Sequence, residues 1–157
     1  MNRVVFLDID GVLNSEEYFI NRDTSVPRES HEDYLVFNLD KILIDKLNKI
    51  IRQVKPIIVL SSSWRVYDMD KINRALRRKG FCSTIMFKTA RPSNDDRGKE
   101  IKDLIQKNDV KDYVVIDDDS FDIESDIPKE QFIKTSWKKG LEDSHVNYIT
   151  KYFNKER

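Results

Sequence analysis

The sequence has few of the features that belong to an oxidising compartment or a membrane. Its single cysteine, Cys82, excludes an internal disulfide, so a reducing cytosol is the compartment we expect. No apolar run approaches the roughly 18 residues that a membrane span needs. The first residues, MNRVVFLDID, also lack a secretory pattern, because the apolar run leads directly into aspartates. The composition therefore predicts a cytoplasmic protein that does not contact a membrane.

An excess of either charge is also missing. Lysine plus arginine and aspartate plus glutamate each number 28, so the formal net charge is zero and no overall field attracts nucleic acid. Histidine is scarce, and His31 and His145 have no ligand-like spacing with each other or with Cys82, so we assign them no metal. Charged residues still make up 36% of the chain against 39% hydrophobic ones, a balance typical of a soluble globular domain.

The length of 157 residues fits one domain that can bury enough apolar surface to fold without disulfides. We therefore expect residues 1–157 to form a single domain. Residues 15–38 show no clear periodicity and include Pro27, so we expect this segment to be a flap, loop or minimal cap.

Short apolar runs rich in β-branched residues predict strands buried on both faces of a parallel sheet. They are Val4 to Leu7, Ile57 to Leu60 and Tyr113 to Ile116, with weaker candidates at Ser83 to Phe87 and Gln131 to Ile133. Amphipathic helices are predicted from Leu39 to Val54, from Asp70 to Lys79, around Ile101, Leu104 and Ile105 after the cap candidates Asp95 and Asp96, and around Val146, Ile149, Tyr152 and Phe153. This alternation predicts a doubly wound, mainly parallel α/β sheet with helices on both faces, in which ligands bind at the carboxyl ends of the strands.

Acidic residues follow two of the predicted strands. Asp8 and Asp10 are separated by one residue and followed by Gly11, which permits a tight turn or a close backbone approach. The segment YVVIDDDSFD places further carboxylates directly after a very apolar strand, at Asp117, Asp118, Asp119 and Asp122. Adjacent carboxylates repel unless they are exposed or neutralised, so a hard, oxygen-seeking ion such as Mg²⁺ is the partner we expect.

Hydroxyl and basic groups occur at two further positions. In IIVLSSSWR, the serines Ser61, Ser62 and Ser63 follow a strand and can donate hydrogen bonds to a bound anion, although serines are also common loop residues. In DDRGKEIKDLIQ, Arg97 and Lys99 lie at the start of a helix, where backbone N–H groups favour a phosphate. Basic residues on a helix can equally face solvent.

The order of acid pair, hydroxyl, cation and acid cluster resembles the haloacid dehalogenase (HAD) superfamily of phosphohydrolases over nearly the whole chain. More narrowly, the combination of LDIDGVLN, LSSSWR, RGKEI, VVIDDD and FIKTSWKKGL is similar to the small, nearly capless HAD domains of Swiss-army-knife RNA repair proteins. The resemblance implies a Rossmann-like core and a Mg²⁺-dependent phosphatase that acts through an aspartyl-phosphate.

The resemblance also implies roles for individual residues. Asp8 would be the nucleophile, and Asp10 would be general acid and then general base. The metal would be held by Asp8, the backbone carbonyl of Asp10 and a carboxylate from Asp117 or Asp118. Two roles have two candidates each: Ser61 or Ser62 would bind the phosphoryl group, and Arg97, with Lys99 second, would stabilise oxygen charge in the transition state.

Substrate contacts are less defined. Gly11 permits close approach of the backbone, and Arg65 either contacts a second phosphate or the body of the substrate, or is a surface charge. The small flap predicts an open site that admits a nucleic-acid end, on whose bases Tyr18, Phe19, Tyr34 and Phe37 would stack unless they pack the flap onto the sheet. A nucleotide or a small metabolite is the alternative substrate. A phosphoacceptor signalling module and a non-catalytic interaction module are rival readings, which the spaced Asp8 and Asp10 after the first strand disfavour.

Overall fold

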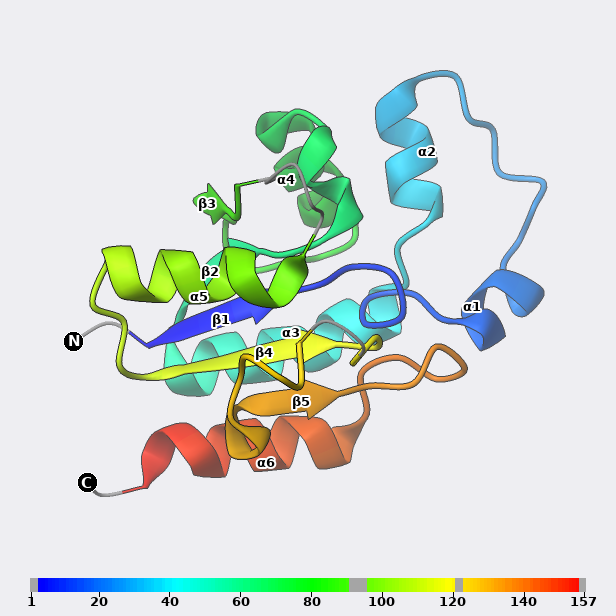
Figure 1. The fold of residues 1–157 in the computed structure, drawn as a ribbon. Helices are drawn as coiled ribbons and strands as arrows, with labels where there is room; N and C mark the ends of the chain where they lie inside the picture. Colours follow the sequence, from blue (N-terminus) through cyan, green and yellow to red (C-terminus); the bar gives the residue numbers. More distant parts are fainter. Residues whose placement is uncertain (1–2, 91–95, 121–122, 156–157) are drawn as a thin grey trace.

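The computed structural model describes residues 3–90, 96–120 and 123–155. Within these residues one sheet of five parallel strands has the order β3-β2-β1-β4-β5 (Figure 1). The strands are β1 (Val4–Leu7), β2 (Ile57–Leu60), β3 (Phe87–Lys88), β4 (Tyr113–Asp117) and β5 (Phe132–Lys134). The doubly wound parallel fold is confirmed. Of the two weaker strand predictions, Ser83 to Phe87 contributes only its last residue, to the short edge strand β3.

Helices connect the strands and cover both faces of the sheet. They are α1 (Glu16–Asn21), α2 (His31–Phe37), α3 (Lys41–Val54), α4 (Met69–Arg78), α5 (Arg97–Lys107) and α6 (Asp143–Asn154), with 3-10 turns η1 (Ser63–Val66) and η2 (Lys129–Gln131). The long helix α3 begins after Asp40, which accepts a hydrogen bond from Ile42 N, and ends at Lys55 in the left-handed conformation, φ 52°, before Pro56. Asp96 caps α5, as predicted, whereas Asp95 lies outside the described residues.

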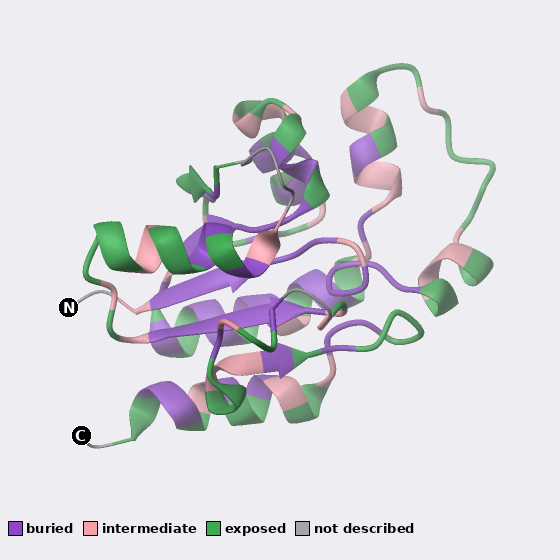
Figure 2. Ribbon diagram, in the orientation of Figure 1, coloured by how far each residue is buried: buried purple, intermediate pink, exposed green. Residues whose placement is uncertain are grey.

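Side-chain alternation divides the core into two layers. Val5 and Leu7 of β1 pack in the larger layer with α3, α4 and α6, whereas Val4 and Phe6 pack in the smaller layer with Ile101 of α5. Figure 2 shows the central strands buried throughout and the outer surface of α5 exposed. Helix α5 therefore covers one face of the sheet, and its first turn reaches the carboxyl ends of the central strands.

The connections reverse direction next to β1. The chain proceeds from β1 through α3 to β2 and through α4 to β3, and then crosses back through α5 to β4 on the other side of β1. The two halves of the sheet thus separate between β1 and β4, and in doubly wound folds this switch point is where ligands bind. Asp8 and Asp117 lie at this position.

Residues 15–38, which were predicted to be a flap, loop or minimal cap, contain two short helices, so the segment is not an irregular loop. Helices α1 and α2 have six and seven residues, fewer than two turns, so an apolar stripe cannot be recognised in them. A capping box at Ser30 and Asp33 is the signal that would have revealed α2. Figure 1 shows α2 beside α4, where Glu32 pairs with Arg74 and Arg78 at 2.7 and 2.9 Å.

No helix in the described part of the chain combines the length and apolar character needed to cross a membrane.

Candidate active site

Three strand ends meet at the switch point. Asp8 follows β1, Ser61 follows β2 and Asp117 ends β4. The parallel ladder continues through them, because Asp8 N donates to Ile116 O at 3.0 Å and Ser61 N donates to Leu7 O at 2.8 Å. Since side chains alternate along a strand, these three follow the face of the sheet that α5 covers.

Helix α5 adds a cation to this row. Arg97, its first residue, places Nη1 2.7 Å from Asp117 Oδ2 and 3.6 Å from Asp8 Oδ2. Lys99 lies on the solvent side, where its side chain is 70% exposed and pairs with Asp96 at 3.3 Å. Of the two basic candidates, the structure therefore brings Arg97 to the carboxylates and leaves Lys99 on the surface.

The carboxylates of Asp8, Asp117 and Asp118 form a compact cluster. Each offers an oxygen, and these oxygens lie within 4.8 Å of one another. Gly11 makes this packing possible: its φ is +77°, and a Cβ at this position would overlap the Asp118 carboxylate. Asp119 contributes its backbone N–H, which donates to Asp117 Oδ1 at 2.9 Å, and Asp122 lies outside the described residues.

Burial and mutual repulsion make it unfavourable for all three carboxyl groups of this cluster to be ionised together. Burial, and then the neighbouring Asp117, raise the pKa of Asp8 well above its usual value, although Arg97 acts in the opposite direction. The same two causes raise the pKa of Asp118 to about 6. Nearby Asp117 and Asp8 raise the pKa of Arg97 against the effect of burial, so the arginine stays charged. One guanidinium offsets only one of the three negative charges that this cluster carries when its carboxyl groups are all deprotonated.

This donor set fits a divalent cation. Carboxylate oxygens are the ligands that Mg²⁺ prefers, and a divalent ion would offset the charge that Arg97 leaves unbalanced. Arg97 lies closer to Asp117, at 2.7 Å, than to Asp8, at 3.6 Å. The backbone carbonyl of Asp10 is a further candidate ligand. The predicted metal residues Asp8, Asp117 and Asp118 are thus brought together, whereas the Asp10 carboxylate is outside this group.

The Asp10 side chain is held by two donors to one oxygen. Asn14 Nδ2 donates to Asp10 Oδ1 at 2.9 Å, and Trp64 Nε1 donates to the same oxygen at 3.2 Å. Asn14 is itself fully buried and fixed, because its Oδ1 accepts from Gly11 N and its Nδ2 also donates to Asn38 O. The carboxyl group of Asp10 therefore has a fixed orientation, with Oδ2 left for other partners.

The two serine candidates have different hydrogen-bonding states. Ser62 Oγ accepts from Trp64 N at 3.2 Å and caps η1. Ser61 is 1% exposed, and its Oγ has no hydrogen-bond partner among the described residues. A buried hydroxyl without a partner is costly in the free protein, so a ligand that accepts from it would be favoured. This contrast favours Ser61 over Ser62 as an anion ligand.

Arg65, expected to be a substrate contact or a surface charge, is only 7% exposed, so the surface expectation is wrong. Its Nη2 lies 3.0 Å from Glu100 Oε1, and its Nη1 donates to Ser62 O at 2.9 Å. Thr89 Oγ1 donates to the other Glu100 oxygen at 3.2 Å. Arg65 thus connects the serine loop to the first turn of α5, which carries Arg97.

Sequence reasoning gave no role to Asn14, Trp64 or Glu100. Asn14 lies four residues after Asp10 in a tight turn, a spacing at which a side chain can return to its neighbour. Glu100 lies on the apolar stripe of α5 next to Ile101, and a charge at a buried helical position is a signal for a buried partner. The Trp64 contact joins residues 54 positions apart, and no local pattern reveals it.

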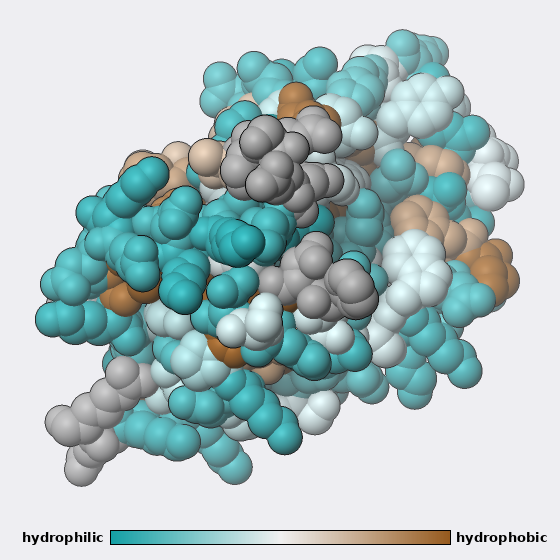
Figure 3. All heavy atoms as spheres, viewed as in Figure 1, coloured by the Kyte–Doolittle hydropathy of each residue, from teal (hydrophilic) through white to brown (hydrophobic). Residues whose placement is uncertain are grey.

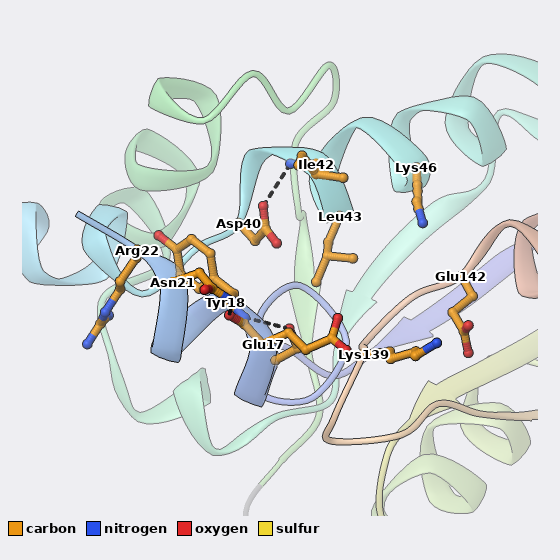
Figure 4. Close-up of a pocket in the computed structure, with 11 residues that line it drawn as sticks. Glu17, Tyr18, Asn21, Arg22, Asp40, Ile42, Leu43, Lys46, Lys139 and Glu142 are labelled. Carbon is orange, nitrogen blue, oxygen red and sulfur yellow. Dashed lines mark hydrogen bonds between the residues drawn. The ribbon is translucent and has the colours of Figure 1, made fainter. Parts of the chain in front are cut away.

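A separate pocket of about 590 Å³ lies beside α1 and α3 (Figure 4). The figure shows Glu17 and Tyr18 of α1, Asp40 at the start of α3, and Lys139 and Glu142 from the segment before α6. None of its lining residues belongs to the acidic cluster, so the chemistry is expected at the strand ends and not in this pocket.

Residues 4–146 match the family described as "HAD domain in Swiss Army Knife RNA repair proteins". The chain belongs to this family. The match covers all five strands and extends into α6, and it confirms the HAD-type fold that the motifs predicted. Membership indicates a HAD-type phosphatase domain in general terms. Searches of curated proteins and of solved structures returned no match.

Proposed function

We propose that this HAD domain is a Mg²⁺-dependent phosphomonoesterase that forms a transient aspartyl-phosphate on Asp8. The observation that supports this most directly is the convergence of Asp8, Asp117 and Asp118 within 4.8 Å beside Arg97, at the switch point of the sheet. When bound, a divalent cation would supply the positive charge that offsets repulsion between a phosphate ester and a carboxylate nucleophile. Asp8, the Asp10 carbonyl and Asp117 or Asp118 would hold it.

In the first step an Asp8 oxygen attacks phosphorus, a P–O bond forms to Asp8, and the bond to the leaving oxygen breaks. Arg97 is close enough to Asp8 to stabilise charge on the phosphoryl oxygens, and the unpartnered Ser61 hydroxyl can donate to another of them. Ser62 is the weaker candidate because its hydroxyl already caps η1.

Asp10 would handle the protons. Its carboxyl group protonates the departing oxygen, and the resulting carboxylate then takes a proton from the water that attacks the phosphoryl group on Asp8. The second attack releases inorganic phosphate and regenerates Asp8 and the protonated Asp10. The hydrogen bonds from Asn14 and Trp64 support this role, because both go to Oδ1 and leave Oδ2 available.

A phosphorylated nucleic-acid end is the substrate class we propose. The family description names RNA repair, and the insertion between β1 and α3 is small, with only the short helices α1 and α2. A nucleotide or small metabolite is the alternative substrate, because the net charge of zero provides no overall basic footprint for a polynucleotide.

Hydrolysis assays test both the phosphatase activity and the nucleic-acid substrate that we propose. The protein is expected to hydrolyse an aryl phosphate with Mg²⁺ and to lose that activity in excess EDTA. Denatured protein quenched during turnover of a ³²P-labelled substrate should carry label that hydroxylamine releases, as an acyl phosphate does. Absence of both activity and label would contradict the phosphatase assignment. Equal, weak rates on 3′- and 5′-phosphorylated oligonucleotides, mononucleotides and sugar phosphates would contradict the nucleic-acid substrate alone.

A further inference from the structure

The turn of residues 136–140, which follows β5, adjoins the segment after β1 that carries Asp8 and Asp10. Thr135 Oγ1 donates to Gly11 O at 2.6 Å, and Leu141 N donates to Val12 O at 3.0 Å, so both ends of the turn are tied to the segment that carries Asp8 and Asp10. Trp137 lies two residues after Thr135, a distance that an extended chain spans in at most about 7 Å. The Trp137 backbone therefore lies within about 7 Å of Thr135, whose hydroxyl contacts Gly11 beside the candidate active site.

Trp137 is an exposed aromatic residue in a fixed position. Its side chain is 45% exposed, its backbone oxygen accepts from Glu16 N at 2.9 Å, and its ring lies 5.6 Å from the ring of Phe19 with an interplanar angle of 33°. Figure 3 shows pale and brown residues gathered at the end of the molecule where α1 lies. We call the rings of Phe19 and Trp137 the aromatic rim.

Two of the other flap aromatics, Tyr18 and Phe37, are engaged in contacts within the flap. The Tyr18 hydroxyl donates to Phe37 O at 2.8 Å, and the Phe37 ring is covered by the guanidinium groups of Arg22 and Arg28, at 3.7 and 4.0 Å from its centroid. Arg22 also lies over the Phe19 ring, at 4.6 Å from its centroid, so Trp137 supplies the exposed surface of the aromatic rim on which a base would stack.

Positive charge accompanies the aromatic rim. The segment FIKTSWKKGL contains no carboxylate, and Lys134 and Lys138 are exposed on either side of Trp137. The exposed Glu16 and Glu17 of α1 adjoin the same turn, because their backbone N–H groups donate to Trp137 O and Lys138 O. Lys134 pairs in register with Asp117, so it lies in the row of strand ends that forms the candidate site. Lys139 instead lines the pocket of Figure 4. A flat aromatic surface between cations complements a base flanked by phosphates.

We propose that the aromatic rim stacks the terminal base of a phosphorylated single-stranded nucleic acid, while Lys134 and Lys138 contact its backbone phosphates. This inference rests on the proposed function, because it places the terminal phosphate at Asp8. It adds a binding subsite that is separate from the catalytic residues. The subsite would select substrates by the presence of a base next to the phosphate.

A comparison of substrates with and without that base tests the subsite. The substrates are a phosphorylated RNA oligonucleotide, the same oligonucleotide with an abasic terminal nucleotide, and glycerol phosphate, which has no ring. Trp137→Ala is expected to lower kcat/KM on the intact oligonucleotide about 5- to 150-fold, the range for loss of one base–aromatic stack. It should change kcat/KM on the other two substrates less than about twofold. Trp137→Phe should retain most of the activity, and Tyr148→Ala, which removes a similarly exposed ring on α6, should have no effect.

Binding measurements separate failure of the subsite from failure of the proposed function. The affinity of labelled oligonucleotide for the Asp8→Asn protein, measured by fluorescence anisotropy, should fall about 5- to 150-fold with Trp137→Ala and only for the oligonucleotide with a terminal base. Equal losses on intact and abasic oligonucleotides, or no loss on either, would overturn the inference. Absence of phosphatase activity on every substrate would contradict the proposed function, and the binding result would still decide whether the aromatic rim stacks a base.

Discussion

Two arginine–carboxylate clusters lie at the first turn of α5, and they differ in how their charges are balanced. In the first, Arg65 faces Glu100 at 3.0 Å, and both Glu100 oxygens accept a hydrogen bond, one from Arg65 and one from Thr89. In the second, Arg97 faces Asp117 at 2.7 Å and Asp8 at 3.6 Å, with Asp118 close by. Among the residues that the structure describes, the first cluster pairs one cation with one anion, whereas the second groups three anions around one cation.

The difference indicates separate roles for two groups that look alike in the sequence. A balanced, buried pair joins segments of the chain, and here it fixes the serine loop to α5. An unbalanced cluster is costly unless a further cation binds, as the raised pKa values of Asp8 and Asp118 reflect. The first cluster should therefore matter for stability without metal, and the second for catalysis and metal binding.

The largest expected effect comes from removing the proposed nucleophile. Asp8→Asn should lower kcat about 10⁴-fold or more, because the loss of a covalent nucleophile leaves only residual catalysis. The metal-free variant should be at least as stable as the wild-type protein, since one of three mutually repelling carboxylates is gone. Steady-state hydrolysis and thermal unfolding in EDTA measure the two effects. Activity close to wild type would contradict the nucleophile, and a clear loss of stability would contradict the unbalanced cluster.

In the balanced cluster, by contrast, removal of a carboxylate should lower the stability of the metal-free protein. Glu100→Ala should lower the free energy of unfolding by about 3–5 kcal/mol, because it leaves the Arg65 guanidinium buried without its carboxylate. Lys99→Ala, on the exposed side of the same helix, should change it by less than about 1 kcal/mol. Urea unfolding in EDTA measures both.

A double variant checks the cause of that loss. Arg65→Met with Glu100→Leu removes both charges and should recover most of the stability that Glu100→Ala loses. A double variant as unstable as Glu100→Ala would show that packing, rather than the unpaired charge, accounts for the loss.

Metal binding should depend on pH with a definite sign. Asp118, with a pKa of about 6, holds a proton in the folded state that it loses in the unfolded state, and the raised pKa of Asp8 acts in the same direction. Protonation of these groups favours folding at low pH, and the contribution of Asp118 is lost as pH rises through 6. Mg²⁺ needs the deprotonated carboxylates, so its stabilising effect should grow over the same range. At 100 times its Kd, Mg²⁺ should raise Tm by about 5–10 °C at pH 7.5.

The matched measurement at pH 5 should show a much smaller increase in Tm. Asp118→Asn should weaken the Mg²⁺ effect at pH 7.5, while Asp126→Asn, which changes a carboxylate that pairs with Lys102 and is outside the acidic cluster, should leave it unchanged. An equal Mg²⁺ effect at both pH values would contradict a metal site whose carboxyl groups must lose protons before the ion binds.

Much of the fold and the row of site residues could be predicted from the sequence, because both follow from local patterns. Val4 to Leu7 is an uninterrupted apolar run, and a carboxylate directly after a buried parallel strand must lie at its carboxyl end. The short helices of residues 15–38 were missed because fewer than two turns show no periodicity.

The choices left open within the site depended on tertiary contacts. Arg97 and Lys99 are two residues apart on α5, and positions about 200° apart around a helix cannot both face the strand ends. Only the docking of α5 on the sheet shows that Arg97 does so. In the same way, the Ser62 hydroxyl caps η1 and the Ser61 hydroxyl does not. The conformation of the turn decides which serine is the cap, and three consecutive serines in the sequence do not reveal that conformation. Long-range partners such as Trp64 and Asp10 have no sequence signal.

The smallest expected effect concerns that last pair and tests whether Asp10 acts as general acid. Trp64→Phe removes the 3.2 Å hydrogen bond to Asp10 Oδ1 but keeps the one from Asn14. It should lower kcat/KM about 3- to 30-fold on alkyl phosphates, whose leaving oxygen needs a proton, part of the 10²–10⁴-fold that a positioned acid contributes. On nitrophenyl phosphate, whose nitrophenolate group leaves without needing a proton, kcat/KM should hardly change. Tyr67→Leu, which removes a ring packed against Trp64, is the control, because a loss from packing alone would affect both substrates equally.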